Sequence, residues 1–353
     1  MDKISLGIIF GGNSSEYEVS LLSACSVLKN INVERYDIHV IGIKKTGEMY
    51  LYTGDNEKIA DNTWIDQANS ECIISSNPAH HGLIVLENDS YRNLRLDCVF
   101  PILHGKNGED GTIQGLLQLS KIPFVGCDLI SSAMCMDKDI THTRLTSENI
   151  KNAKWVAILK SDYLVNSEYF IKKLEQTFSY PMFVKPANAG SSVGITKAKN
   201  KEDLINAIDL AFTHDKKIIV EETLSGAEIE CAVLGNDSPK ASIPGEIMPC
   251  NDFYDYEAKY IKNESKTIIP ARLSELTLQK VRDTAVQAYK VMGCSGLSRV
   301  DFFVTKDDEV ILNEINTIPG FTQISMYPKM WAETGLPYSQ LIDALIDLAM
   351  ENN

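Results

Sequence analysis

One segment near the C-terminus holds side chains whose types and spacing could bind a metal ion. Two alternating apolar runs flank a short polar stretch, which predicts a β-hairpin. If the turn is centred between Asp307 and Asp308, Asp301 lies opposite Glu314. Arg299 then lies opposite Asn316, and the alternation of a strand puts all four side chains on one face. The hairpin therefore predicts a cluster of two carboxylates, an amide and a guanidinium.

Facing carboxylates repel each other unless a cation lies between them. Mg²⁺ takes hard oxygen ligands of this kind, usually together with substrate phosphates. The alternative interpretation is a solvated face of an antiparallel pair. The loop 317–322 follows Asn316 directly, and its Gly320 allows a ligand to approach the backbone. This continuity favours a functional site.

Three other segments carry candidate residues, each with a structural alternative. Lys185 ends an apolar strand and precedes the small-residue loop 186–194, which could place a cation and backbone N–H groups on a phosphate; an ordinary turn is the alternative. The loop is not a Walker A motif. Glu16 near a helix start could be a ligand or a capping residue, and His104 at a strand end could be functional or structural.

The elements that must position these residues differ along the chain. Up to about residue 130, apolar strands alternate with helices, and glycine-rich loops follow two of the strands, which predicts a doubly wound parallel sheet with its ligand crevice at the carboxyl ends of the strands. A polar excursion is expected over 45–92. Residues 131–217 predict a small α+β unit, and residues 218–353 predict antiparallel strands with two long helices.

Composition narrows the function classes. The chain has 353 residues, 44% of them hydrophobic and 23% charged, so the whole chain is expected to fold, in two or three domains. Its net charge of −14 makes nucleic acid an improbable partner. No long apolar run predicts a membrane span or a signal peptide. The eight cysteines are scattered, which is typical of free thiols in the cytoplasm.

Taken together, these segments resemble the D-alanine-D-alanine ligases of the ATP-grasp superfamily, including the vancomycin-resistance-type D-alanine-D-serine ligases. The resemblance runs nearly the whole length and rests on seven landmarks in order: 9–20, 103–115, 136–138, 184–194, 253–260, 298–301 and 313–320. It implies an N-terminal substrate-binding domain followed by a two-part ATP-grasp fold. It also implies that ATP phosphorylates a first D-alanine and that the amine of a second amino acid attacks the acyl phosphate, giving D-alanyl-D-alanine for peptidoglycan.

The resemblance implies a role for each matching residue. ATP would be held by Lys138, Lys185, Glu221, Glu228 and Lys259, and two Mg²⁺ (or Mn²⁺) ions by Asp301, Glu314 and Asn316. Arg299 would stabilise the oxyanion of the tetrahedral intermediate. Substrate would contact Glu16, His104, Gly320, Ser325 and Met326, and Ser191 and Tyr260 would join Glu16 to close a mobile loop, about 248–267, over the site. A homodimer is implied by family analogy.

The second substrate stays open between D-alanine and D-serine. Tyr260 is typical of relatives that use an amine nucleophile, and Met326 stands where the D-serine ligases carry an arginine, which favours D-alanine. Other segments resemble the D-serine branch, and residues 323–325 depart from the usual pattern. Two broader alternatives are another ATP-grasp carboxylate-amine ligase and a non-catalytic nucleotide-binding protein; the intact set of candidate residues argues against the latter.

Overall fold

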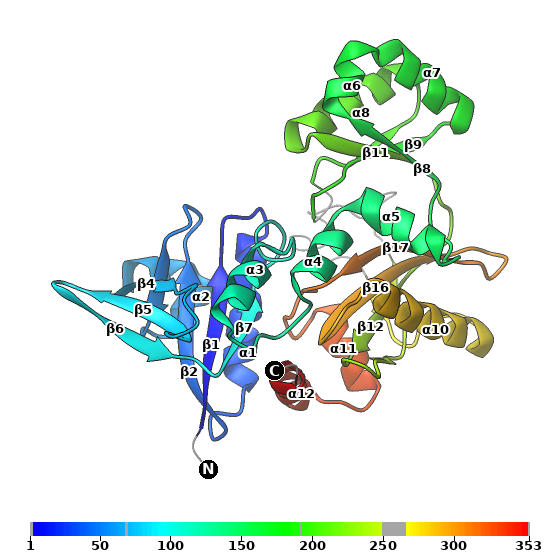
Figure 1. Cartoon of the computed structure of the whole chain (residues 1–353). Coiled ribbons are helices and arrows are strands. Elements are labelled where there is room, and N and C mark those ends of the chain that lie inside the picture. Colours follow the sequence, from blue (N-terminus) through cyan, green and yellow to red (C-terminus); the bar gives the residue numbers. More distant parts are fainter. Residues whose placement is uncertain (1–2, 68–69, 191–192, 249–265, 352–353) are drawn as a thin grey trace.

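The computed structural model describes residues 3–67, 70–190, 193–248 and 266–351. Its strands form three separate sheets (Figure 1). The first belongs to the N-terminal part, the second to a small unit of four strands, and the third to the C-terminal part. None of the described helices is long and apolar enough to cross a membrane.

Three parallel strands form one end of the N-terminal sheet, as the sequence predicts for this part of the chain. Strand β1 (Ile4–Gly11) pairs with β2 (Tyr36–Ile43) on one side and with β7 (Cys98–Ile102) on the other. Nearly all of β1 and all of β7 are buried, because α1 (Tyr17–Asn30) and other helices pack against the sheet. The carboxyl ends of β1 and β7 therefore lie side by side and carry the two glycine-rich loops.

The segment expected to be an excursion instead extends this sheet. Strands β3 (Met49–Tyr52), β4 (Ser70–Ile74), β5 (Gly82–Glu87) and β6 (Ser90–Arg95) add to the β2 edge, each antiparallel to its neighbour. Between them lie α2 (Glu57–Ala60) and a 3-10 helix (Thr63–Gln67). β6 is mostly exposed, so its sequence has no continuous apolar run that would mark a strand. The sheet is therefore parallel over β2, β1 and β7 at one end and antiparallel over the rest.

The second sheet is antiparallel, in the order β10-β9-β11-β8. Its strands are β8 (Trp155–Leu159), β9 (Met182–Pro186), β10 (Thr196–Ala198) and β11 (Lys217–Glu222), and its helices are α6 (Lys160–Val165), α7 (Ser167–Thr177) and α8 (Lys201–His214). The boundary expected between 217 and 218 falls at the start of β11. β11 pairs with both β8 and β9, and the division of the chain into units stays a prediction.

The third sheet carries the predicted hairpin. Its order is β15-β14-β12-β16-β17, formed by β12 (Ala227–Leu234), β14 (Gly245–Met248), β15 (Lys266–Ile268), β16 (Leu297–Val304) and β17 (Val310–Asn316), with β13 (Lys240–Ala241) beside β12. Helix α10 (Glu275–Val291) packs on the apolar face of β12, β16 and β17. The opposite face packs partly against α11, and its polar part, which carries Arg299 and Asp301, belongs to the site.

The remaining helices connect these units. They are α3 (Thr112–Ser120), α4 (Leu129–Met136), α5 (Lys138–Ser147), α11 (Met326–Glu333) and α12 (Tyr338–Glu351). Helix α12 returns to the N-terminal sheet (Figure 1), where Asp343 accepts a hydrogen bond of 2.6 Å from the Tyr36 hydroxyl. Apolar residues of α1, β1, β7, α11 and α12 form one core, so the two ends of the chain are packed together.

Candidate active site

The β16–β17 hairpin pairs the predicted residues as expected, although its turn differs. Asp301 lies opposite Glu314, and Arg299 lies opposite Asn316. Nearer the turn the pairing shifts by one residue, because a bulge lies between Asp301 and Phe302. The observed turn also differs from the predicted one, because it is not centred between Asp307 and Asp308. The bulge and the changed turn compensate, so the register at the site is the predicted one.

The polar face of this hairpin is a connected cluster. The Arg299 guanidinium makes two bonds to Asp301, of 2.7 Å from Nε and 2.6 Å from Nη2. Asn316 donates its side-chain amide to Asp301 at 3.0 Å. Glu230 of β12, which lies opposite Asp301, forms an ion pair of 3.2 Å with Arg299. The face therefore offers carboxylates held in place by a guanidinium and an amide.

This donor set fits Mg²⁺. Asp301 and Glu314 supply two carboxylates and Asn316 supplies an amide oxygen, all on one face of the sheet. Mg²⁺ is typically bound by one or two carboxylates together with substrate phosphates. Arg299 sits on the same face and could stabilise a developing oxyanion beside such a metal.

Two predicted ATP lysines lie near this face. Lys138, the first residue of α5, donates its Nζ to the carbonyl oxygen of Ala189 at 2.7 Å. Burial lowers the pKa of Lys138, Lys185 lowers it further, and the Glu314 and Glu221 carboxylates act in the opposite direction. Lys138 thus lies within electrostatic range of Lys185 and of Glu314, as phosphate binding next to a metal requires.

Lys185 is held by a buried carboxylate. Its Nζ lies 2.5 Å from Oε2 of Glu221, whose Oε1 lies 2.8 Å from Nε2 of His142. Burial would raise the pKa of Glu221, but the charge of Lys185 and the bond to His142 outweigh it and lower the pKa to about 2. Glu221 is therefore ionised and fixes Lys185. Its predicted role at the adenine stays a prediction.

The other predicted nucleotide contacts are only partly described. Glu228 lies on β12, two residues before Glu230 and on the same face. Lys259 and Tyr260 lie outside the described residues, as does Ser191. The predicted loop 248–267 falls mostly in the same undescribed range; its ends, Met248 and Lys266, are paired between β14 and β15.

Glu16 lies where the N-terminal and central units meet. It is the residue before α1, its side chain is buried, and a Cβ added at Gly105 would overlap its Oε2. A Cβ at Gly190 would also come within 2.8 Å of Oε2, so the loop that leads to Ser191 borders Glu16. Burial and the Glu16 carboxylate raise the pKa of Glu109 well above its usual value. This pair of neighbouring carboxyl groups suits an ammonium group.

His104 links two loops instead of presenting a free ring. Its Nε2 lies 3.0 Å from the Ser23 hydroxyl, and its Nδ1 lies 3.0 Å from the carbonyl oxygen of Ile318. The residue is 3% exposed. His104 thereby ties the end of β7 to the loop that contains Gly320.

The loop after β17 brings Gly320 and Ser325 together. A Cβ at Gly320 would lie 3.2 Å from the Ser325 hydroxyl, which is also 2.8 Å from the hydroxyl of Thr322. Met326 begins α11, is 7% exposed, and packs with the core. A Cβ at Gly245 would overlap its methyl group. Met326 is thus a core residue, and its predicted effect on the second substrate stays a prediction.

Sequence reasoning missed three residues that hold the site residues in place: Ser23, His142 and Lys217. Helical spacing from a predicted site residue could have identified two of them. His142 lies four residues after Lys138, on the same face of α5. Ser23 lies seven residues after Glu16, on the buried face of α1. Lys217 gave no local signal, because its partners are distant in the sequence.

Comparisons with known proteins agree with this geometry. The family model described as "D-ala D-ala ligase N-terminus" matches residues 5–127, and that described as "D-ala D-ala ligase C-terminus" matches residues 145–347. A D-alanine-D-alanine ligase from Caldicellulosiruptor bescii is 50% identical, covering 100% of this chain and 97% of the relative. One from Clostridium acetobutylicum is also 50% identical, covering 99% of both chains.

Two solved structures are also similar. The VanG D-Ala:D-Ser ligase from Enterococcus faecalis superposes with a TM-score of 0.90 at 46% identity, covering 99% of this chain and 100% of that one. The D-alanine-D-alanine ligase from Coxiella burnetii superposes with a TM-score of 0.88 at 38% identity, covering 100% of this chain and 95% of that one.

Proposed function

The chain belongs to the D-alanine-D-alanine ligase family, and on this premise we propose that it is an ATP-dependent ligase that joins two D-alanines. The carboxylate of the first D-alanine takes the terminal phosphoryl group of ATP, which leaves ADP. The amine of the second D-alanine attacks the acyl phosphate, and phosphate leaves. The product is D-alanyl-D-alanine for peptidoglycan synthesis.

The observation that carries this proposal is that Lys138 lies near both a second lysine and the carboxylate face. Lys138 lies within electrostatic range of both Lys185 and Glu314. Lys138 and Lys185 would hold the phosphates of ATP, and Asp301, Glu314 and Asn316 would hold two Mg²⁺ or Mn²⁺ ions. When bound, these ions neutralise the charge that develops on the transferred group. Glu221, Glu228 and Lys259 would complete the nucleotide site.

The substrate contacts follow from the same arrangement. Glu16 would bind the ammonium group of the first D-alanine, and Arg299 with the Gly320 backbone would stabilise the tetrahedral oxyanion. Ser325 would face the second substrate. His104 supports this site indirectly, by holding the loop that carries Gly320.

Water must be kept away from the acyl phosphate. We propose that the loop 248–267 closes over the site and that Tyr260 and Ser191 meet Glu16 when it does. The position of Gly190 beside Glu16 supports this assignment. We also propose a division of the chain into units 1–130, 131–217 and 218–353.

D-serine is the second candidate for the attacking amino acid. The similarity to the VanG D-Ala:D-Ser ligase favours it. Against it stands Met326, which gives a serine hydroxyl no strong partner. The test is ATP-dependent phosphate release with Mg²⁺ and D-alanine, alone and with D-serine or D-lactate, with products identified by mass. D-alanyl-D-alanine as the main product in the mixture supports our assignment, and predominant D-alanyl-D-serine overturns it.

We propose that the enzyme works in the cytoplasm, where ATP is available. The cysteines of the described part, which are all free and buried, are consistent with a reducing compartment.

We also propose a homodimer, by analogy with the family. Size-exclusion chromatography with light scattering tests the dimer.

A further inference from the structure

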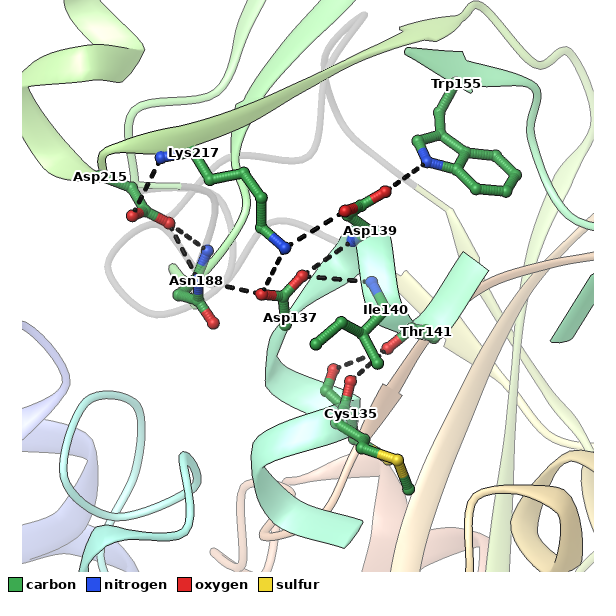
Figure 2. Close-up of polar contacts among 10 residues, drawn as sticks. Cys135, Asp137, Asp139, Ile140, Thr141, Trp155, Asn188, Asp215 and Lys217 are labelled. Carbon is green, nitrogen blue, oxygen red and sulfur yellow. Dashed lines mark hydrogen bonds and ion pairs between the residues drawn. The ribbon is translucent and has the colours of Figure 1, made fainter. Parts of the chain in front are cut away.

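A partly buried ion network surrounds the start of α5 (Figure 2). The proposed phosphate-binding lysine, Lys138, is the first residue of this helix. The ammonium of Lys217, at the start of β11, lies 2.8 Å from Oδ2 of Asp137 and 3.2 Å from Oδ2 of Asp139. These carboxylates precede and follow Lys138 in the chain. The side chains of Lys217 and Asp137 are 19% and 11% exposed, so solvent screens this pair only weakly.

Both carboxylates also have structural tasks. Asp137 caps α5, accepting hydrogen bonds from the backbone N–H groups of Asp139 and Ile140 at 3.1 and 3.2 Å. Asp139 accepts a bond of 2.9 Å from the indole N–H of Trp155 in β8. Lys217 thus links the cap of α5 to two strands of the four-stranded sheet.

The start of β11 also holds the loop that contacts Lys138. Asp215 accepts a bond of 2.8 Å from the backbone N–H of Asn188, whose side-chain amide lies between Asp215 and Asp137 (Figure 2). The backbone of Lys217 accepts a bond from Ala187 at 2.9 Å. The loop 187–189 is therefore fixed between α5 and β11.

The position of the Lys138 side chain depends on both α5 and the loop 187–189. Its backbone N–H donates to Ala187 at 3.0 Å, and its ammonium donates to Ala189 at 2.7 Å. A shift of α5 relative to the loop would move the ammonium away from these positions. The charge of Lys217 also balances the carboxylates on either side of Lys138, which would otherwise compete with phosphate for its ammonium.

We propose that Lys217 is a positioning residue for nucleotide binding: its ion pairs with Asp137 and Asp139 hold the start of α5 against the loop 187–189, so that Lys138 is presented to the phosphates of ATP. This inference rests on the proposed function, since it takes Lys138 as a phosphate ligand. Lys217 acts through Lys138 and does not contact the reacting atoms.

The test compares Lys217→Met with Lys217→Arg and with Lys216→Met in the full-length chain. Lys216 is the adjacent lysine, and its side chain is exposed, so its variant removes the same charge outside the network. ATP affinity is measured by calorimetry without D-alanine, and kcat and both KM values are measured by phosphate release. We expect Lys217→Met to weaken ATP binding and raise its KM by about tenfold. The KM for the first D-alanine should stay unchanged.

The controls separate positioning from general damage. Lys217→Arg should restore most of the ATP affinity, because it keeps the charge and the donors, and Lys216→Met should bind ATP like the unmutated chain. Unchanged ATP affinity in folded Lys217→Met overturns the inference. Equal loss of ATP and D-alanine binding together with a lower Tm also overturns it, since that marks a purely structural role. If Lys217→Met does not fold, Lys217→Gln replaces it with the same expected direction.

The calorimetric measurement also separates this inference from the proposed function. An unmutated chain that binds ATP but makes no dipeptide contradicts the ligase assignment and leaves the Lys217 comparison fully readable. An unmutated chain that binds no ATP overturns both.

Discussion

The Nδ1 atom of His104 lies 3.0 Å from the carbonyl oxygen of Ile318, although the two residues are 214 positions apart. A carbonyl oxygen only accepts hydrogen bonds, so Nδ1 carries the proton. In the neutral ring Nε2 is then an acceptor, and the Ser23 hydroxyl donates to it. Burial lowers the pKa of His104 to about 4, which keeps the ring neutral at physiological pH.

The first prediction concerns stability in mild acid. Because the folded pKa of about 4 is below the ordinary 6.5, the unfolded state binds a proton first as the pH falls. The free energy of unfolding should therefore decrease between pH 6.5 and 4. His104→Asn should lose stability at pH 7 and show a weaker decrease in this window. Urea unfolding at several pH values measures this, with exposed His214→Asn as control; an identical pH dependence in His104→Asn contradicts the assignment.

The second prediction concerns the buried partner of Lys185. Glu221→Gln leaves the Lys185 ammonium without its ionised partner, and should lower the free energy of unfolding by about 3 kcal/mol at pH 7. The folded pKa of Glu221 is depressed from 4.5 to about 2, so its stabilisation is present above pH 4.5 and is lost as the pH falls towards 2. The variant should lack this acid-dependent component. Glu222 is unsuitable as a control, because its carboxylate accepts a bond from the backbone N–H of Lys154. The control is Glu202→Gln, at an exposed position on α8.

The third prediction tests the metal assignment. Glu314→Ala should fold but lose ATP turnover, with kcat reduced by at least about 100-fold through loss of Mg²⁺ binding. Phosphate release across a range of Mg²⁺ concentrations measures the effect, and circular dichroism checks the fold. Glu309→Ala, in the turn of the same hairpin, is the matched control. Near-normal turnover in Glu314→Ala refutes the metal role.

The fourth prediction tests the oxyanion role of Arg299. Arg299→Lys keeps the charge but cannot reproduce the two parallel bonds to Asp301. We expect kcat to fall by about 100-fold while the affinity for ATP, measured by calorimetry, changes little. Arg144→Lys, an exposed arginine on α5, is the control. A large loss of ATP affinity with unchanged kcat would show that Arg299 serves nucleotide binding instead.

The fifth prediction concerns the packing of Met326. Gly245→Ala places a methyl group where the Met326 methyl lies, and should lower the free energy of unfolding by about 1–3 kcal/mol. In a Met326→Ala background the same change should cost much less, because the overlap is gone. Denaturant unfolding of the four proteins in this cycle provides the measurement. Additive effects would mean that the two residues do not contact.

The hairpin shows how a sequence prediction can succeed for an incomplete reason. Alternation of apolar residues predicts that Asp301 faces Glu314, and the structure has this pair. The predicted turn, however, lacks the bulge between Asp301 and Phe302. A bulge depends on how the strand packs against its neighbours, which alternation in one sequence does not record.

The sequence by itself determined the elements and the local chemistry of this protein. Buried parallel strands, glycine-rich loops and the hairpin follow from patterns within a few residues, and they identify Lys185, Asp301 and Glu314 as candidates. Lys138 is identified only through the family resemblance. Only the tertiary structure decided which partners hold these residues. Lys217 meets Asp137 and His104 meets Ile318 because segments far apart in the chain fold against each other, and contacts between distant positions leave no periodic signal in one chain.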